Sequence, residues 1–231
     1  MKYKYKELTV YKRDDMIQRA RYDLTLREQR IVLYALSQIK ADDDYDTLYS
    51  IELKDLYNIC NVDDESYSRF KSIIHKLADK SWEVLLPSGY ISIVRWFSVV
   101  RISRDTGLIQ FKFHEDMAPY VFDLVRQNKF YTGYQIVNVL PMTKQASPRL
   151  YELFKSYSKN NDGWRFDIQH LKSLLCAEHY SEWADFRRRV LEPSIEEINR
   201  LTDLNVSYKV EKDGRKVSAI VFVFEKCEFP E

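Results

Sequence analysis

Three consecutive arginines, Arg187, Arg188 and Arg189, are the residues of this chain whose type and spacing best fit a defined chemistry. An arginine can donate two parallel hydrogen bonds to O6 and N7 of guanine, which discriminates against a wrong base by ~1–3 kcal/mol. Successive helical residues point in different directions, about 100° apart, so the three cannot all enter one groove. The pattern places Arg188 and Arg189 opposite the apolar face, with Arg187 on the flank.

A second basic group, Lys212, Arg215 and Lys216, surrounds the dipeptide Asp213-Gly214 between two β-rich runs. Asp-Gly favours a hairpin turn because both positions tolerate a positive φ. Cations at such a tip suit phosphate contacts, which fix the register on a duplex without reading its sequence. An arginine-bearing helix followed by a basic hairpin predicts a winged helix, with double-stranded DNA as the natural ligand.

The residues before the hairpin carry the periodicity of one helix face. The apolar positions fall at steps of three, four, eight and three: Trp183, Phe186, Val190, Ile198 and Leu201. An interior proline costs roughly 3 kcal/mol in a helix, so at Pro193 either the helix kinks or a new one starts at Glu192. Asn199 and Arg200, late on this helix, are weaker candidates for DNA contact.

Each basic group also has an interpretation without DNA. Arg188 and Arg189 could pair with Glu192 and Glu196 at helical spacing on a solvated face. The cations of the hairpin could simply keep a sheet edge soluble. Composition alone favours the solvated face for Arg188 and Arg189, and the neighbouring hairpin adds weight to base contact by at least one of them.

The rest of the chain predicts an α+β protein in which the order helix, strand, helix, helix, strand, strand occurs twice. Residues 1–20 are expected to form an extended basic arm. Thr25 and Glu28 form a capping-box pattern that starts the first helix. The aromatic-rich stretch 128–142 is the candidate linker, which gives an N-terminal domain over 1–130 and a C-terminal domain over 131–231.

In the first domain, the equivalent DNA-facing helix is expected over 65–80. Its core residues should be Phe70, Ile73, Ile74 and Leu77. The polar positions that remain available are Ser68, Arg69, Lys71, Ser72, His75 and Lys76. We expect contacts with the DNA backbone from Arg69, Lys71 and Lys76, although a mixed polar face needs no ligand. Farther along, the strand-like stretch 90–105 is expected to supply sheet core or a dimer interface built by strand pairing.

The totals fit a protein with local rather than overall positive charge. The chain has 231 residues, 45% hydrophobic residues and a formal charge of only +1, although its first 30 residues hold nine Lys/Arg against five Asp/Glu. Three scattered cysteines indicate reduced thiols. The start of the sequence has no apolar signal-peptide core, and no apolar run could span a bilayer, so we expect a cytoplasmic protein without membrane contact.

No pattern supports catalysis, a metal or a cofactor. The four histidines, at 75, 114, 170 and 179, do not lie at metal-ligand spacing. The His-x-His motif of rolling-circle nicking enzymes is absent, as is the Gly-x-x-x-x-Gly-Lys-Ser/Thr phosphate loop. We therefore expect a protein that works by binding alone.

The run SPRLYELFKSY at 147–157 and the run DFRRRVLEPSIEEINRLTDLNVSYKVEKDGRKVSAIVFVF at 185–224 closely resemble the C-terminal half of the Rep3-type plasmid replication initiators. Agreement in the N-terminal half is looser, in LTLREQRIVLYALSQI and FHEDMAPYVFDL. The resemblance extends from about Asp15 to Phe224.

The resemblance implies two tandem winged-helix domains that bind directly repeated origin sequences, called iterons. It further implies that the protein helps to open the duplex and recruits the host helicase and initiator. Dimers would repress their own gene through a contact in the first domain, and monomers would be active. The family's base-reading arginines would fall on 187–189.

Three other functions remain open. A winged-helix transcriptional repressor without a replication role needs the same DNA surface. A nicking enzyme predicts a covalent tyrosyl–DNA adduct formed with a divalent metal. An interaction scaffold predicts no salt-sensitive DNA binding.

Overall fold

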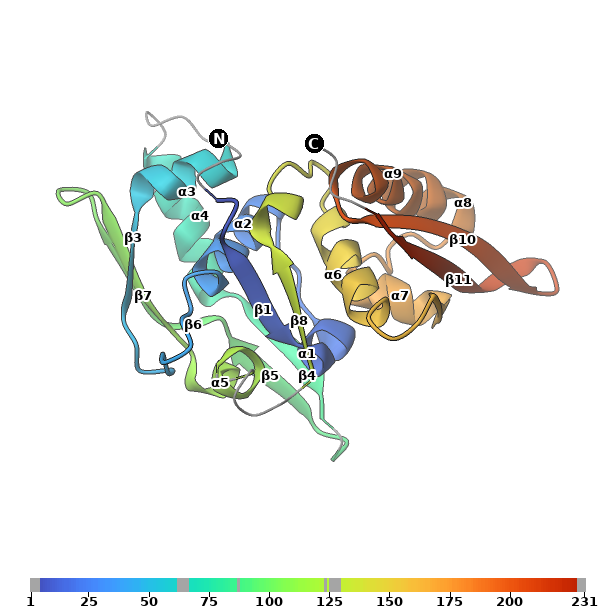
Figure 1. Cartoon of the computed structure of the whole chain (residues 1–231), viewed down its shortest axis with the longest axis horizontal. Coiled ribbons are helices and arrows are strands. Elements are labelled where there is room, and N and C mark those ends of the chain that lie inside the picture. Colours follow the sequence, from blue (N-terminus) through green and yellow to red (C-terminus); the bar gives the residue numbers. More distant parts are fainter. Residues whose placement is uncertain (1–4, 62–66, 87, 123, 125–129, 228–231) are drawn as a thin grey trace.

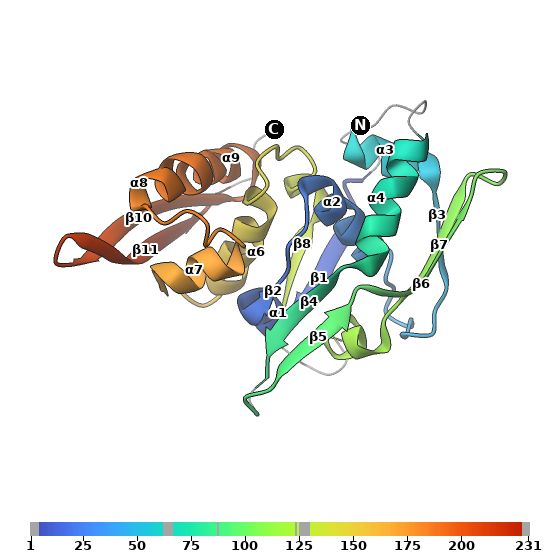
Figure 2. The same ribbon diagram turned by 180° about the vertical axis from the view of Figure 1, so that it is seen from behind.

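The computed structural model describes residues 5–61, 67–86, 88–122, 124 and 130–227. Two lobes lie side by side, the first built from the blue-to-green part of the chain and the second from the yellow-to-red part (Figure 1). Among the described residues, the first lobe holds two three-stranded antiparallel sheets and the second lobe holds one, and helices pack against them. The turn between β6 (Phe97–Ser103) and β7 (Leu108–Phe113) and the turn between β10 (Leu204–Asp213) and β11 (Lys216–Lys226) lie at opposite ends of the molecule (Figures 1 and 2).

The second lobe has the element order of a winged helix. Its helices are α6 (Ser147–Tyr157), α7 (Ile168–Leu174), α8 (Trp183–Phe186), the π-helical segment η4 (Arg187–Leu191) and α9 (Glu192–Leu201). Its strands are β9 (Gly163–Asp167), β10 (Leu204–Asp213) and β11 (Lys216–Lys226). The sheet order β10-β11-β9 puts the long hairpin beside the first strand of the unit. Pro148 falls in the first turn of α6, where a missing N–H costs nothing.

The first lobe repeats this order. Its helices are α2 (Leu26–Leu36), α3 (Leu53–Cys60) and α4 (Tyr67–Asp79), and its strands are β3 (Tyr49–Glu52), β6 (Phe97–Ser103) and β7 (Leu108–Phe113). The sheet order β3-β7-β6 matches that of the second lobe. The predicted double occurrence of one architecture is therefore confirmed.

The first lobe differs from the second in having one additional hairpin. The strand expected over 90–105 is instead two strands, β5 (Ile91–Arg95) and β6, which belong to different sheets. β5 pairs with β4 (Ser81–Leu85), and β4 pairs with β2 (Ala20–Arg21). The break falls at Trp96, whose side chain is fully buried and contacts Trp82 and Tyr22 edge-on or tilted. Burial of this ring directs the chain from one sheet to the other.

Local signals account for the starts and ends of the first helices. Thr25 accepts a hydrogen bond from the backbone N–H of Glu28, while the Glu28 carboxylate accepts from the backbone N–H of Thr25. This is the predicted capping box. Asn61 ends α3 in the left-handed conformation, with φ 51°, which asparagine tolerates better than most residues.

The expected N-terminal arm is wrong, because residues 9–21 are part of the folded body. They form β1 (Thr9–Arg13), α1 (Asp14–Arg19) and β2. Val10, Met16 and Ile17 are completely buried and anchor this segment in the core. The basic composition misled the prediction, since the charge of Lys12 is itself buried against Glu152.

The expected linker also contains regular structure. It holds β8 (Tyr131–Gln135) and the 3-10 turn η3 (Ile136–Asn138), and β8 pairs antiparallel with β1. β1 and β8 lie between the lobes, beside α6 (Figure 1). A short helical stretch follows β7 in the described residues. It comprises the 3-10 turn η2 (Glu115–Met117) and α5 (Ala118–Val121), after which Phe122 is extended.

Candidate nucleic-acid interface

The helix of the second lobe that carries the arginines runs from Trp183 to Leu201 through a π-helical segment. Proline has no N–H, so Pro193 cannot bond to the carbonyl of Arg189, and its ring crowds that carbonyl. In the structure the N–H of Glu192 donates to the carbonyl of Arg187, five residues earlier. This wider turn accommodates Pro193 in the first turn of α9. The helix therefore continues through the proline, with a change of register in place of a break.

The change of register decides which apolar residues face the core. Phe186, Leu191 and Ile198 are fully buried, and Ile195 nearly so. Val190, which the helical spacing predicts as a core residue, is only partly buried. The extra residue in the π turn moves the inward position from Val190 to Leu191. A strict 3.6-residue period could not predict this shift.

The structure places the three arginines on the exposed surface of this helix. The side chains of Arg188 and Arg189 are 70% and 60% exposed, and that of Arg187 is 49% exposed. Asp185 Oδ1 lies 3.2 Å from Nη2 of Arg188 and 3.4 Å from Nε of Arg189. The alternative expectation, pairing with Glu192 and Glu196, is therefore wrong, because these two arginines pair toward the N-terminus of the helix.

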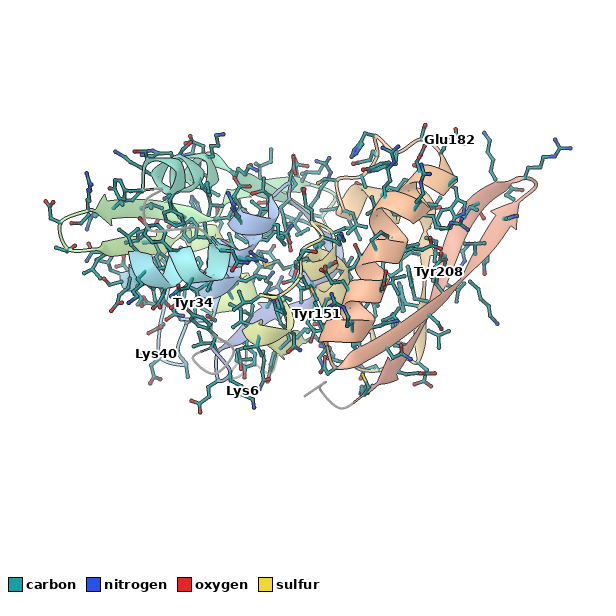
Figure 3. All side chains as sticks on the ribbon, turned by 90° about the horizontal axis from the view of Figure 1, so that it is seen from above. Lys6, Tyr34, Lys40, Tyr151, Glu182 and Tyr208 are labelled. Carbon is teal, nitrogen blue, oxygen red and sulfur yellow. The ribbon has the colours of Figure 1, made fainter. Side chains whose placement is uncertain are left out.

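Arg187 belongs to a separate group at the junction of helix and hairpin. Its Nε lies 3.6 Å from Oε1 of Glu192, and the Tyr208 hydroxyl donates to the same oxygen at 3.1 Å. Burial raises the pKa of Tyr208, and the neighbouring Glu192 carboxylate raises it further. Figure 3 shows Tyr208 on the hairpin beside this helix, and Glu182 at the start of the helix. The contact fixes the hairpin relative to the arginines.

The hairpin tip carries its cations in the open. Lys212, Arg215 and Lys216 are exposed, and the described part of the chain offers none of them an ion pair. Asp213 pairs with Lys216, so the two turn residues are Gly214, with φ 59°, and Arg215. The turn is thus one residue later than Asp213-Gly214, because a bulge between Glu211 and Lys212 shifts the register. A positive φ at the first turn position is the requirement that glycine meets here.

The later candidates on this helix differ from each other. Both amide atoms of Asn199 bond to the backbone of Val206, donating to its carbonyl at 3.0 Å and accepting from its N–H at 2.7 Å. Asn199 therefore joins the helix to β10. Arg200 is exposed near the C-terminal end of α9, about 16 Å along the axis from Arg189 at 1.5 Å per residue.

In the first lobe, α4 presents the predicted face. Phe70, Ile74 and Leu77 are buried, with Ile73 partly buried against the same core. Lys71 and Lys76 are exposed, so both are available to a ligand. The side chain of Arg69 lies outside the part of the chain that the structure describes.

The sequence analysis missed the cations of the first-lobe hairpin. The β6–β7 hairpin corresponds in topology to the β10–β11 hairpin, and it carries two exposed arginines, Arg101 within β6 and Arg104 in the turn. The Arg104 guanidinium lies over the Tyr67 ring, 5.3 Å from its centre, at the start of α4. A hollow of about 440 Å³ is lined by this turn, by α3 and by Tyr67. The local signal for this hairpin was the Asp105-Thr106-Gly107 turn, which Arg104 directly precedes.

Two features are absent from the described residues. None of their helices has the length and apolar composition needed to cross a bilayer. In the same residues, histidine, cysteine, aspartate and glutamate side chains do not gather into any group of three suited to a metal ion.

Comparison with known families gives two matches that together span most of the chain. Residues 9–155 match the family described as initiator replication protein, WH1. Residues 167–224 match the family described as initiator Rep protein, WH2. The first match alone covers more than half of the chain.

The chain is also similar to individual proteins and to a solved structure. A stretch of 149 residues is 30% identical to the PI protein of Escherichia coli, and it spans 58% of this chain but only 48% of that protein. An uncharacterised 27.6 kDa protein of E. coli is 21% identical over 91% of this chain and 93% of its own length. The crystal structure of the Pi initiator protein in complex with iteron DNA has the same fold, with a TM-score of 0.76 over 96% of this chain and 99% of that one, at 22% identity. The two-winged-helix fold is thereby confirmed.

Proposed function

The chain belongs to the Rep3 family of initiator replication proteins, and we propose that it initiates plasmid replication by binding directly repeated origin sequences as double-stranded DNA. The observation that carries this proposal is the exposed pair Arg188 and Arg189 on a helix next to a hairpin with an exposed basic tip. A helix of this kind fits the major groove, and the hairpin fits the phosphates beside it.

The division of roles follows from exposure and position. Arg188 and Arg189 read bases, while Arg187 supports the junction of helix and hairpin through Glu192. Lys212, Arg215 and Lys216 contact phosphates, and Arg200 is a weaker phosphate contact. An overall charge of only +1 keeps the field local to these groups, so non-specific binding is limited.

The first lobe adds contacts with the backbone of the same duplex. Its proposed contact residues are Arg69, Lys71 and Lys76 of α4, together with Arg104 of the β6–β7 hairpin. Because the two hairpins lie at opposite ends of the molecule, the lobes would engage separate segments along the repeat (Figures 1 and 2). Two-point attachment of this kind would distort the duplex and favour its opening.

The β4–β5 hairpin supports a homodimer. Leu85, Tyr90, Ile91 and Ile93 are 55%, 75%, 63% and 67% exposed, and β5 is an edge strand of its sheet. Such an edge invites pairing with a second copy of the same chain, which would cover these side chains. We propose that this dimer represses its own gene, whereas the monomer initiates replication in the cytoplasm and recruits the host helicase and initiator.

The test uses the DNA that flanks the gene. A mobility-shift assay with that DNA should show salt-sensitive binding to a segment with tandem repeats of ~20 base pairs, and a shuffled duplex should bind at least about a thousandfold more weakly. A plasmid that carries the flanking DNA but lacks its own initiator should replicate only when the chain is supplied. Equal affinity for both duplexes would contradict the proposal.

A transcriptional repressor without a replication role is the alternative, since it would use the same surface. It predicts specific binding to the flanking DNA together with failure of the replication assay. No nicking activity is proposed, and a covalent adduct between a tyrosine and DNA would contradict the proposal.

A further inference from the structure

One carboxylate, that of Asp185, holds both of the arginines proposed to read bases. Its Oδ1 atom lies 3.2 Å from Arg188 Nη2 and 3.4 Å from Arg189 Nε. The spacings are i,i+3 and i,i+4, so all three side chains lie on one face of the helix. Asp185 is itself 43% exposed on that face. Any surface that the arginines approach is therefore approached by a negative charge as well.

The other acidic partner in this region has a different environment. Glu192 pairs with Arg187 at 3.6 Å and accepts a hydrogen bond from the Tyr208 hydroxyl. That carboxylate is held by the hairpin and serves the junction. Within the described part of the chain, the ion-pair partners of Asp185 are these two arginines alone. Its function is therefore tied to what those arginines do.

Exposed ion pairs are weak and are easily exchanged for other partners. When Arg188 or Arg189 leaves Asp185 for a phosphate, the carboxylate loses its counter-charge and lies near a polyanion. A phosphate contact that is available on every sequence gains little against this loss. Arg189 meets Asp185 through Nε, so its two terminal nitrogens can donate both hydrogen bonds to guanine while the ion pair is kept. The loss therefore falls mainly on phosphate contacts.

We propose that Asp185 is a specificity-determining residue, which suppresses binding to non-cognate DNA by pairing Arg188 and Arg189 and by repelling phosphates. Discrimination by a repulsive group placed beside the attractive ones is a general device of specific interfaces. The inference rests on the proposed function, because it requires that these arginines meet a duplex.

The experiment compares Asp185→Asn with Glu196→Gln in the full chain. Both changes remove one negative charge from the same helix. Glu196 is exposed and forms no ion pair with another described residue. Fluorescence anisotropy would measure binding to a duplex with the flanking repeat and to a shuffled duplex of the same composition, over a series of salt concentrations.

Asp185→Asn should raise affinity for the shuffled duplex by about fivefold, the size expected for one exposed charge pair, and should change affinity for the repeat less than about twofold. The specificity ratio should fall accordingly, and Glu196→Gln should leave it unchanged. An equal change on both duplexes, or an equal effect of the two variants, would overturn the inference.

Two controls separate the causes. Asp185→Ser, which keeps a polar side chain without the charge, should reproduce the loss of specificity. If Asp185→Ser does not reproduce that loss, charge is not the cause and the inference fails. Circular dichroism should show an intact fold for Asp185→Asn and for Asp185→Ser. If Arg188→Ala and Arg189→Ala leave repeat binding unchanged, the proposed function fails; if they weaken it while Asp185→Asn alters no ratio, only the role of Asp185 fails.

Discussion

The ammonium of Lys12 on β1 lies 2.5 Å from Oε1 of Glu152 on α6, although 140 positions separate the two residues. Both side chains are only 2% exposed. The Tyr134 hydroxyl also donates to Oε1 of Glu152. The other carboxylate oxygen, Oε2, accepts from the Tyr22 hydroxyl at 2.9 Å and lies 3.6 Å from Arg149 Nη1. One carboxylate of α6 thus joins the strand pair β1–β8 to the second lobe.

The charges in this cluster depend on each other. Burial alone would raise the pKa of Glu152, but Lys12, Arg149 and the hydrogen bonds hold it below its ordinary value. Burial lowers the pKa of Lys12, while Glu152 opposes that effect. Each charge is tolerated in the interior because its partner is present.

Glu152→Ala should destabilise the protein by about 3–5 kcal/mol, because it leaves Lys12 and Arg149 buried without a counter-charge. Urea unfolding followed by circular dichroism measures this loss. Lys159→Ala is the matched control, since its pair with Asp14 at 2.6 Å is partly exposed and should be worth about 1 kcal/mol or less. Equal losses in the two variants would show that burial does not amplify the interaction.

Acid should destabilise the fold through Glu152 and Glu197. Burial would raise the pKa of Glu197, but hydrogen bonds from the Thr143 hydroxyl and from the backbone N–H groups of Thr143 and Lys144 hold it below its ordinary value of 4.5. A carboxyl whose folded pKa is lowered stabilises the protein above its unfolded pKa, and that contribution is lost as the pH falls through the folded value. Stability should therefore fall from about pH 5 downward.

The measurement is the free energy of unfolding at several pH values. Glu197→Gln should have a shallower decline between pH 5 and 3 than the unchanged protein, because one lowered pKa has been removed. A decline of unchanged slope would show that Glu197 does not contribute to acid sensitivity.

Much of the architecture could be predicted from sequence because its signals are local. Thr25 and Glu28 act within one helical turn, and the structure has the capping box that they predict. The arginines and the basic hairpin tip were also found from local type and spacing. Their exposure agrees with the predicted arrangement.

The wrong predictions concern segments whose structure is determined by contacts with residues distant in the sequence. Residues 9–21 look polar and basic, yet Lys12 is buried because Glu152 meets it from the other lobe. Trp96 divides one strand-like run between two sheets, since its ring packs against Trp82 and Tyr22. The position of Arg104 over the Tyr67 ring likewise depends on residues that are distant in the sequence.

Replacing Ile93 by Lys should weaken the proposed dimer, because an exposed apolar side chain on β5 would be exchanged for a charge in the interface. Burial of an isoleucine is worth about 1.5–3 kcal/mol, so the dissociation constant should rise at least about tenfold. Sedimentation equilibrium measures the change. Leu48→Lys, at a residue 41% exposed outside the hairpin, should leave the constant unaltered; a similar shift would remove β5 from the interface.

Lys212→Ala and Arg215→Ala should weaken binding to every duplex and flatten its dependence on salt. Each lost phosphate contact should lower the slope of log affinity against log salt by about 0.9. Lys226→Ala is the control on the same hairpin, because Lys226 is exposed at the end farthest from the tip. If both tip variants keep the full slope, the hairpin does not contact phosphates.

Arg188→Ala and Arg189→Ala should each weaken binding to the repeat by about 1–3 kcal/mol and relax the preference for one base pair. Arg188→Lys separates reading of bases from attraction to phosphates, since it keeps the charge but loses the planar pair of donors. Affinity of the lysine variant for shuffled DNA should therefore stay near that of the unchanged protein, while affinity for the repeat should fall almost as far as in Arg188→Ala. Lys40→Ala, an exposed cation of the first lobe far from this helix (Figure 3), should change neither. Full binding of the repeat by Arg188→Lys would assign Arg188 to a phosphate, and Arg189 would then be the remaining candidate for guanine.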